Sequence, residues 1–410
     1  MKKAIVLGGT EDHIKLIEIL KNKGYYTILI DYYENPPAKT ISDEHIIESA
    51  LDEEKVLKIA KTRDVQLTIA LCIDQAILTM AYVSEKMGTP CYLSYQQALW
   101  MTNKSFMKEK MRDYDIPTSE FFITDKNFDL AEIMTKVDFP LVIKPVDSNS
   151  GNGVTKVENE DQLLSAIQNA LGFTRTGKVI VEEYVLGDEY SAEFFIKNND
   201  PINIVTTRTF KTDLHDNKFI TVNSMSPASL ERKHFNELKR IAKRISDTFR
   251  IKSGPLFIQF LKNETGLWVV EFSSRMGGGS RHHFIQHATD FDYLDHLVSF
   301  NLGEKRNRIA LNKNKNHFGC YFVYSSPGTL KKINGVKELN ENHHLKGFYY
   351  YKTLDSKIRG NNSSSHRVFC FIVEASSFKQ LKEVVQVIDN RVSILDENNN
   401  DLMIHNLYHK

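Results

Sequence analysis

The stretch Val-Ile-Val-Glu-Glu-Tyr-Val-Leu-Gly-Asp-Glu, residues 179–189, carries the most specific signal for the fold of this chain. Its apolar, β-branched start is typical of a buried strand, and the two acids Glu182 and Glu183 close that strand. A strand end of this kind can hold a planar base through backbone groups, here those of Glu183 and Val185. Glu189, placed after a glycine, can accept from the hydroxyls of a ribose. An ordinary acidic surface turn explains the stretch as well.

Two lysines and a glycine-bearing loop precede this strand. Lys144 follows the apolar run 141–143, where an unpaired ammonium is costly, so we expect a carboxylate partner or an anionic ligand beside it. Lys104 lies earlier, in a predicted helix. The loop 147–153 combines glycines with amides and hydroxyls that can donate to phosphate oxygens, although a plain hairpin turn also fits it. The loop residues that we expect to face phosphate are Ser148, Ser150, Gly151 and Gly153.

Downstream, two predicted strands place oxygen ligands on one face. Gln259 lies in the first strand, and Glu271 and Ser273 alternate along the second. Oxygen donors suit Mg²⁺, which bridges protein carboxylates to a triphosphate. Arg275, two residues further on, has the planar fork that matches phosphate oxygens. These residues predict a metal site next to a transferring phosphoryl group.

The first hundred residues alternate strand and helix, which indicates a parallel, doubly wound sheet. Ligands gather at the carboxyl ends of such strands, where Gly8, Gly9 and Asp74 fall. The run Gly-Gly-Thr-Glu lacks the spacing of a dinucleotide motif. It is therefore either a plain tight turn or a loop whose backbone faces the acceptor substrate.

Bulk properties narrow the class of protein. The chain has 410 residues, 53 basic against 52 acidic side chains and a net charge of +1, so neither nucleic acid nor membrane is expected as a partner. Its four cysteines form no Cys-x-x-Cys pair, which favours a reducing, cytoplasmic location without structural zinc. No signal peptide is expected.

The histidines near residue 285 allow three interpretations. His283 and His287 have the spacing of a zinc pair, but no His-Glu-x-x-His pattern supports it. His282 and His283 are alternatively substrate contacts, or ordinary packing residues.

Taken in order, these motifs resemble the ATP-grasp ligases, most specifically between Lys104 and Arg275. The resemblance implies α/β and α+β architecture: a Rossmann-like N-terminal domain (1–98), a two-lobed ATP-grasp domain (99–311, with a small lid lobe about 117–185) and a small C-terminal α+β domain (317–410). It also implies ATP and Mg²⁺, with Mn²⁺ as an alternative, at the residues above. Lys104 and Lys144 would contact phosphates, with Lys144 and Arg275 catalytic, Glu182 opening the adenine hinge, and Gln259, Glu271 and Ser273 holding metal.

Finer features of the resemblance suggest the chemistry. Gln259 with Glu271, and the run 280–290, are similar to carbamoyl phosphate synthase, while residues 326–335 are similar to L-amino acid ligases. We therefore expect a ligase that joins a small-molecule carboxylate, an amino acid in the first instance, to an amine through an acyl phosphate, with a homodimer as one option for its assembly. Two alternatives stay open, a catalytically impaired ATP-binding module and a carboxyphosphate-forming enzyme of purine type. The first arises because Ser273 replaces the family's asparagine, a better metal ligand.

Overall fold

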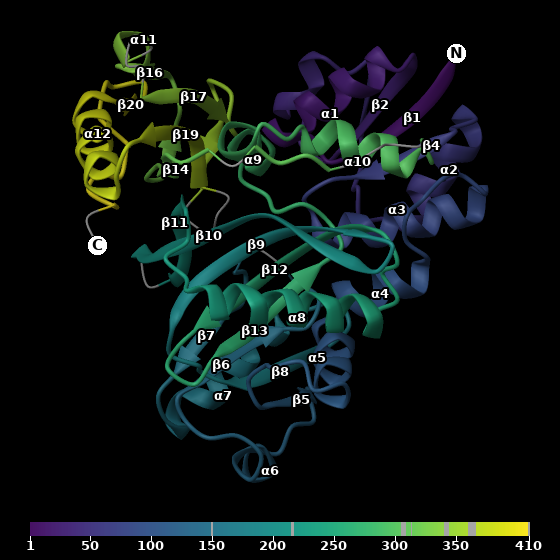
Figure 1. Ribbon diagram of the computed structural model, residues 1–410, viewed down its shortest axis with the longest axis vertical. Helices are drawn as coiled ribbons and strands as arrows, with labels where there is room; N and C mark the ends of the chain where they lie inside the picture. Colours follow the sequence, from purple (N-terminus) through teal and green to yellow (C-terminus); the bar gives the residue numbers. More distant parts are fainter. Residues whose placement is uncertain are drawn as a thin grey trace.

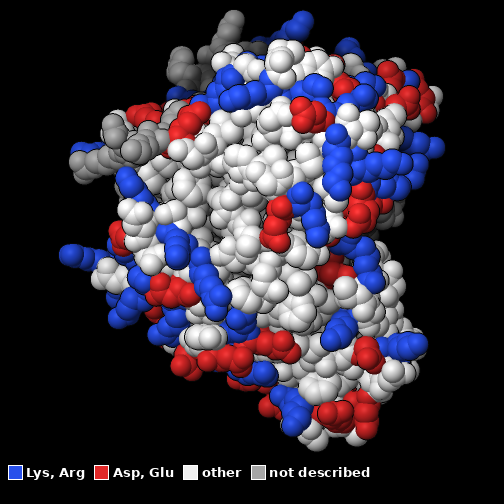
Figure 2. All heavy atoms as spheres, turned by 90° about the vertical axis from the view of Figure 1, so that its right-hand side faces the viewer, with Lys and Arg blue, Asp and Glu red and all other residues white. Residues whose placement is uncertain are grey.

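The computed structural model describes residues 1–148, 151–214, 217–304, 309–312, 314–339, 344–359 and 366–408. Figure 1 shows the N-terminal domain in purple at the upper right, the C-terminal strands and helix at the upper left, and the two helices of residues 281–301 between them, with most of the remaining chain below. Within the described residues, no helix has both the length and the apolar character needed to cross a bilayer. On the face drawn in Figure 2, basic and acidic side chains are interspersed, in keeping with the near-zero net charge.

The N-terminal domain is a four-stranded parallel sheet with strand order β3-β2-β1-β4. Its elements are β1 (Lys2–Leu7), α1 (Glu11–Asn22), β2 (Tyr25–Asp31), η1 (Pro37–Thr40), β3 (Glu44–Ile47), α2 (Glu53–Arg63), β4 (Leu67–Ala70) and α3 (Asp74–Met87). The alternation predicted from apolar periodicity is confirmed, and Gly88 ends α3 with φ of 65°, where a side chain would be strained. The sequence does not predict β3, because it lacks a continuous apolar run.

Two short helices connect this domain to the rest of the chain. α4 (Tyr95–Thr102) begins with a capping box between Ser94 and Gln97. Asn103 then ends α4 and caps α5 (Lys104–Asp113) by accepting from the amide of Ser105. This pair of caps fixes Lys104 in the first turn of α5, at the entrance to the cleft described below.

The lid lobe is an antiparallel sheet with strand order β5-β8-β6-β7. Its elements are β5 (Phe121–Asp125), α6 (Leu130–Met134), β6 (Leu141–Pro145), β7 (Thr155–Val157), α7 (Glu160–Leu171) and β8 (Lys178–Glu183). Its main hydrophobic core, which includes Leu141, Ile143, Leu163 and Val181, is separate from the large core of the molecule. A lobe with its own core can keep its structure while moving against its neighbours.

An eight-stranded sheet with order β13-β12-β9-β10-β11-β14-β19-β17 forms the centre of the molecule. Its strands are β9 (Asp188–Lys197), β10 (Asp200–Leu214), β11 (Asn217–Ser226), β12 (Gly254–Lys262), β13 (Leu267–Ser273), β14 (His317–Tyr324), β17 (Leu345–Tyr350) and β19 (Arg367–Ala375). Because β11 pairs with β14, the division predicted between residues 311 and 317 falls within one continuous sheet. Only tertiary pairing decides this, since β11 and β14 are far apart in sequence.

Helices cover this sheet and its edges. The predicted amphipathic helix near residue 240 is α8 (Arg232–Thr248), whose buried stripe includes Leu238, Ile241 and Ile245. The remaining elements are α9 (Arg281–Thr289), α10 (Tyr293–Asn301), β15 (Gly328–Thr329), β16 (Lys332–Asn334), α11 (Val336–Leu339), β18 (Lys357–Ile358), α12 (Phe378–Arg391) and β20 (Ser393–Leu395). Among these, α9 begins directly after the glycine run 277–279 and faces the start of α1 (Figure 1).

Candidate active site

A cleft lies between α3 of the N-terminal domain, the start of α5 and the end of β13. It brings together residues that are up to two hundred positions apart in the chain. Six of the predicted site residues line it: Asp74, Lys104, Ser148, Glu271, Ser273 and Arg275. These residues come from three separate parts of the fold, so the site forms only when the chain is folded.

Lys104 joins the glycine-bearing loop to the predicted metal strand. Its Nζ donates to the carbonyl of Ser148 at 2.6 Å and lies 3.9 Å from Oε2 of Glu271. Its backbone amide also donates to the carbonyl of Val146 at 2.8 Å. The ammonium therefore stands between the loop and a carboxylate, as a phosphate-binding lysine would.

A buried cluster of two lysines and one carboxylate lies behind this position. Nζ of Lys144 is 2.8 Å from Oε1 of Glu182, and Nζ of Lys108 is 2.9 Å from Oε2 of the same side chain. Ser119 also donates to Glu182, at 2.9 Å. Burial raises the pKa of Glu182, but the charges of Lys108 and Lys144 outweigh it and lower that pKa to about 2. Burial lowers the pKa of Lys108 to about 8, against the pull of Glu182.

Both partners left open for Lys144, a carboxylate and an anionic ligand, are compatible with this cluster. A carboxylate partner is present, yet two lysines share one glutamate, so the cluster carries a net positive charge when all three groups are ionised. Such a buried excess charge favours an added anion. The sequence reasoning did not single out Lys108; its place one helical turn after Lys104 was a signal that could have found it.

The predicted hinge residues lie at the end of β8 and just beyond it. The amide of Glu183 donates to the carbonyl of Glu120 at 3.0 Å, and its carboxylate accepts from the amide of Asp138 at 3.2 Å. Val185 lies in the connection from β8 to β9. The side chain of Glu182 turns inward to the two lysines, so its role in the structure is ionic and its place at the hinge stays a prediction.

The glycine-bearing loop is described only in part. Ser150 lies outside the described residues, whereas Ser148 lines the cleft. Gly151 and Gly153 have φ of 77° and 71°, and a Cβ on Gly153 would lie 2.9 Å from the ring of Phe173. This backbone needs glycine, as expected for a loop that comes close to a ligand.

The predicted metal residues lie on adjacent strands. Gln259 of β12 is paired with Glu271 of β13. Glu271 and Ser273 line the cleft, and the amide of Gln259 donates to Oε1 of Glu189 at 3.5 Å. A carboxylate, an amide oxygen and a hydroxyl within one region fit a hard cation that keeps several waters, such as Mg²⁺. Glu189 also pairs with Lys211 of β10 at 2.6 Å, a contact that the sequence does not predict.

Arg275 is held by the N-terminal domain. Its Nε and Nη2 donate to the two carboxylate oxygens of Asp74, each at 2.6 Å, and its Nη1 donates to the carbonyl of Met276 at 2.8 Å. Burial raises the pKa of Asp74, but the guanidinium outweighs it and holds that pKa below its ordinary 3.8. Burial opposes the charge of Arg275 as well, while Asp74 raises the pKa of Arg275 above its usual range. Asp74 thus positions the arginine, and two of its five N–H groups have no partner in these bonds.

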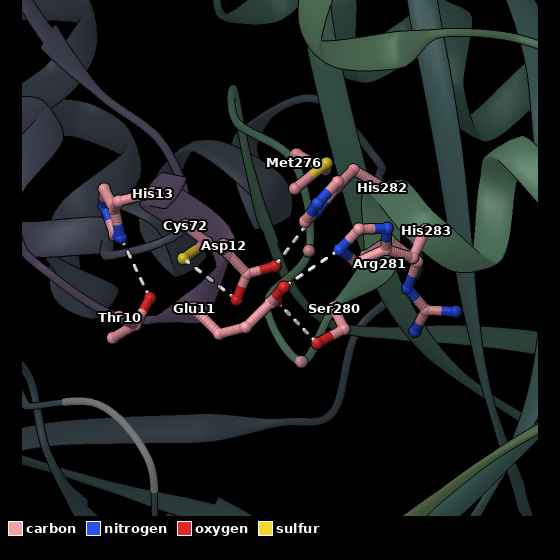
Figure 3. Close-up of polar contacts among 12 residues, drawn as sticks. Thr10, Glu11, Asp12, His13, Cys72, Met276, Ser280, Arg281, His282 and His283 are labelled. Atoms are coloured by element: carbon pink, nitrogen blue, oxygen red, sulfur yellow. Dashed lines mark hydrogen bonds and ion pairs between the residues drawn. The ribbon is translucent and has the colours of Figure 1, made fainter. Parts of the chain in front are cut away.

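The other predicted substrate residues lie around the start of α1. Gly8 has φ of 99°, and a Cβ there would lie 2.6 Å from Ile73. The amide of Gly9 donates to Asp31 at 2.7 Å. The tight-turn interpretation is therefore sufficient for both glycines. His282 and His283 do not line the cleft but contact two acids of α1, Asp12 and Glu11. Figure 3 shows this second cluster.

Comparison with known proteins identifies a family match within this chain. A family model described as ATP-grasp domain matches residues 137–283, the segment that holds Lys144, the hinge and the metal strands. The segment that contains these residues is therefore similar to an ATP-grasp domain. A formate-dependent phosphoribosylglycinamide formyltransferase from Bacteroides thetaiotaomicron is 24% identical over 281 residues, covering 67% of this chain and 71% of the relative.

Two solved structures show that the ATP-grasp fold extends over nearly the whole chain. An L-amino acid ligase from Bacillus licheniformis aligns with a TM-score of 0.79 at 17% identity, over 97% of this chain and 99% of the other. The biotin carboxylase domain dimer of a 2-oxoglutarate carboxylase from Hydrogenobacter thermophilus, in complex with MgADP and bicarbonate, aligns with a TM-score of 0.78 at 15% identity, over 96% and 90%. The predicted architecture, a parallel N-terminal sheet followed by the ATP-grasp lobes, is confirmed.

Proposed function

We propose that this ATP-grasp protein is an ATP-dependent ligase that joins a carboxylate, an amino acid in the first instance, to an amine and releases ADP and phosphate. The observation that carries the proposal is the cleft in which Lys104, Glu271 and Arg275 meet. A lysine, a metal-binding carboxylate and a fixed arginine in one place are what phosphoryl transfer needs, because its catalysis is largely positioning and electrostatics. The L-amino acid ligase is among the solved structures with this fold, which supports the amino acid as the acid.

The proposal assigns nucleotide contacts to the described residues. Lys104 and Lys144 bind phosphates, Ser148, Gly151 and Gly153 cover them, and Glu183, Val185 and Glu189 hold the nucleoside. Glu271, Gln259 and Ser273 hold Mg²⁺, or Mn²⁺ in its place. When bound, the ion neutralises charge that spreads over the phosphate oxygens.

The reaction then has two steps. A carboxylate oxygen of the substrate attacks the γ-phosphorus, the bond to the β–γ bridging oxygen breaks, and ADP leaves. Arg275, held by Asp74, donates hydrogen bonds to the transferring group. The amine then attacks the acyl phosphate, its nitrogen loses a proton, and inorganic phosphate leaves an amide behind.

A screen of ADP release over amino acids, singly and in pairs, tests the proposal. We expect ADP release that needs both an acid and an amine, and a loss of at least a hundredfold in Lys144→Ala and Glu271→Gln, consistent with removing an electrostatic group. Lys136→Ala and Glu264→Gln, at exposed positions of the lid lobe and of the turn between β12 and β13, are matched controls and keep activity. Intact amine-dependent turnover in Lys144→Ala or Glu271→Gln would contradict these roles.

A carboxyphosphate-forming enzyme of purine type is the second candidate. The formyltransferase relative and the bicarbonate-bound carboxylase domain favour it. Bicarbonate-dependent ADP release in the presence of a phosphoribosylated amine, without an amino acid, decides for this candidate. ATP binding without turnover on any acid would instead indicate the impaired module, and recovery of turnover in Ser273→Asn would trace the impairment to the missing asparagine.

Two further expectations belong to this proposal. The free cysteines Cys72, Cys91, Cys320 and Cys370 support a reducing, cytoplasmic location. The carboxylase domain is a dimer, which supports a homodimer here, and sedimentation velocity measures it directly.

A further inference from the structure

A second cluster of charged and metal-ligating side chains lies where the first turns of α1 and α9 face each other. Nε2 of His283 is 2.9 Å from Oε1 of Glu11, and Nδ1 of His282 is 3.3 Å from Oδ1 of Asp12. Figure 3 shows both acids reaching from α1 toward the two histidines of α9. Ser280 donates to the other oxygen of Glu11 at 2.9 Å.

Among the described residues, no lysine or arginine forms an ion pair with the two buried carboxylates of this cluster. Glu11 is 7% exposed, Asp12 2% and His282 5%. The nearby guanidinium of Arg281 is turned away from the acids in Figure 3 and donates hydrogen bonds to the hydroxyls of Ser191 and Thr207. Buried carboxylates need compensating charge. A bound cation is one source of that charge that this geometry offers.

Both histidines lie in the first turn of α9 and face the two acids of α1. In addition, Nε2 of His282 is buried and has no hydrogen-bond partner among the described residues. A buried ring nitrogen without a hydrogen bond is a candidate metal ligand. Neutral imidazole is the form that binds metal ions.

We propose that Glu11, His282 and His283 bind a divalent transition-metal ion of the zinc class. One ligand atom from each lies within 4.8 Å of the others. Ligand atoms around a tetrahedral zinc are about 3.3 Å apart. Side-chain rotations that move each ligand atom by about an ångström therefore bring the three atoms to that spacing. Two imidazoles with one carboxylate suit zinc, cobalt or nickel better than magnesium. Asp12, beside His282, orients that ring as an outer carboxylate.

The site joins all three regions of the chain and is separate from the predicted Mg²⁺ ligands. Glu11 comes from the N-terminal domain and the histidines from the helix after the metal strand. The ring of His283 stacks on Tyr349 of β17, with centroids 3.8 Å apart and planes 18° apart. Tyr351, just beyond β17, contacts Ser280 at 2.9 Å. A bound ion therefore stabilises the packing of the C-terminal strands on the start of α1.

Cobalt binding to the full chain, purified without a histidine tag, tests the site. We expect one Co²⁺ to bind per chain and to show the visible d–d absorption of low-symmetry coordination. Adding Zn²⁺ should abolish this absorption by displacing the Co²⁺. Either ion should raise the melting temperature. Glu11→Gln and His283→Gln are expected to raise the Kd for Co²⁺ by more than tenfold, since changes outside the first ligand shell already cost about 10- to 100-fold.

Two controls separate this site from others. His287→Gln removes a histidine of the same helix that contacts Tyr349 and is not part of the cluster. Glu271→Gln removes the carboxylate of the nucleotide cleft. Both are expected to keep the Co²⁺ spectrum. The proposal is overturned if the wild-type chain shows no such spectrum, if Glu11→Gln and His283→Gln keep it, or if only Glu271→Gln loses it. The wild-type measurement decides even if a cluster variant fails to fold.

Discussion

Replacing Glu182 by glutamine removes the one negative charge between Lys108 and Lys144 while keeping the shape of the side chain. The pKa of Glu182 falls from its ordinary 4.5 to about 2, because the two lysines outweigh the effect of burial. That fall corresponds to roughly 3 kcal/mol of folding free energy at neutral pH. Loss of the shared partner also leaves two buried ammonium groups facing each other. We therefore expect Glu182→Gln to lower the free energy of unfolding by about 3–5 kcal/mol at pH 7.

The sign of the pH dependence follows from the direction of the shift. Since the pKa of Glu182 is lower in the folded chain, its contribution is present above pH 4.5 and is lost as pH falls through about 2. The gap between wild type and Glu182→Gln should therefore shrink across that interval. Lys108→Met should be much milder at pH 7, within about 1 kcal/mol, because Lys144 still neutralises the glutamate and a costly buried charge is gone.

Urea unfolding followed by tryptophan fluorescence measures these differences, because both tryptophans, Trp100 and Trp268, lie on regular elements, α4 and β13. Glu109→Gln is a matched control, an exposed glutamate next to Lys108 on α5. The reasoning is refuted if Glu182→Gln unfolds at the same urea concentration as the wild type at pH 7. It is also refuted if Lys108→Met is the more damaging of the two.

Three further changes test other parts of the site. Asp74→Asn removes the charge that holds Arg275, and we expect kcat/KM for the ligase reaction to fall at least tenfold in steady-state assays while ATP binding measured by calorimetry is kept. Gly8→Ala forces a side chain into positive φ and against Ile73, so differential scanning calorimetry should show a loss of about 1–3 kcal/mol. Arg175→Ala removes a 3.0 Å bond from the lid lobe to α3, and an about fivefold higher KM for ATP is expected, the equivalent of one hydrogen bond of about 1 kcal/mol.

Local sequence patterns were sufficient to predict most individual helices and strands. Apolar periodicity predicts the helices near residues 80, 165 and 240 and most strands, because a face that must be buried imposes its own spacing. The two strands with the predicted metal ligands, the glycine-bearing loop and the two predicted lysines could also be identified from the sequence, because a charge at the end of an apolar run needs a partner wherever the chain places it.

The pairing of residues far apart in the chain could not be predicted from local sequence patterns. The strands around the predicted domain boundary belong to one sheet, since β11 pairs with β14 across almost a hundred residues. Asp74 as the partner of Arg275, and Lys108 as a second partner of Glu182, likewise arise from segments that meet only in the folded chain.

The sequence by itself determined which residues are candidates for the chemistry, since residue type and local spacing set charge, donor capacity and strand or helix preference. Tertiary structure alone decided which of them share a partner, how Glu182 divides between two lysines, and that Glu11 meets His283. The physical reason is that ion pairs and ligand sets depend on distances of a few ångströms between atoms, and only packing of the separate layers brings positions 11 and 283 that close.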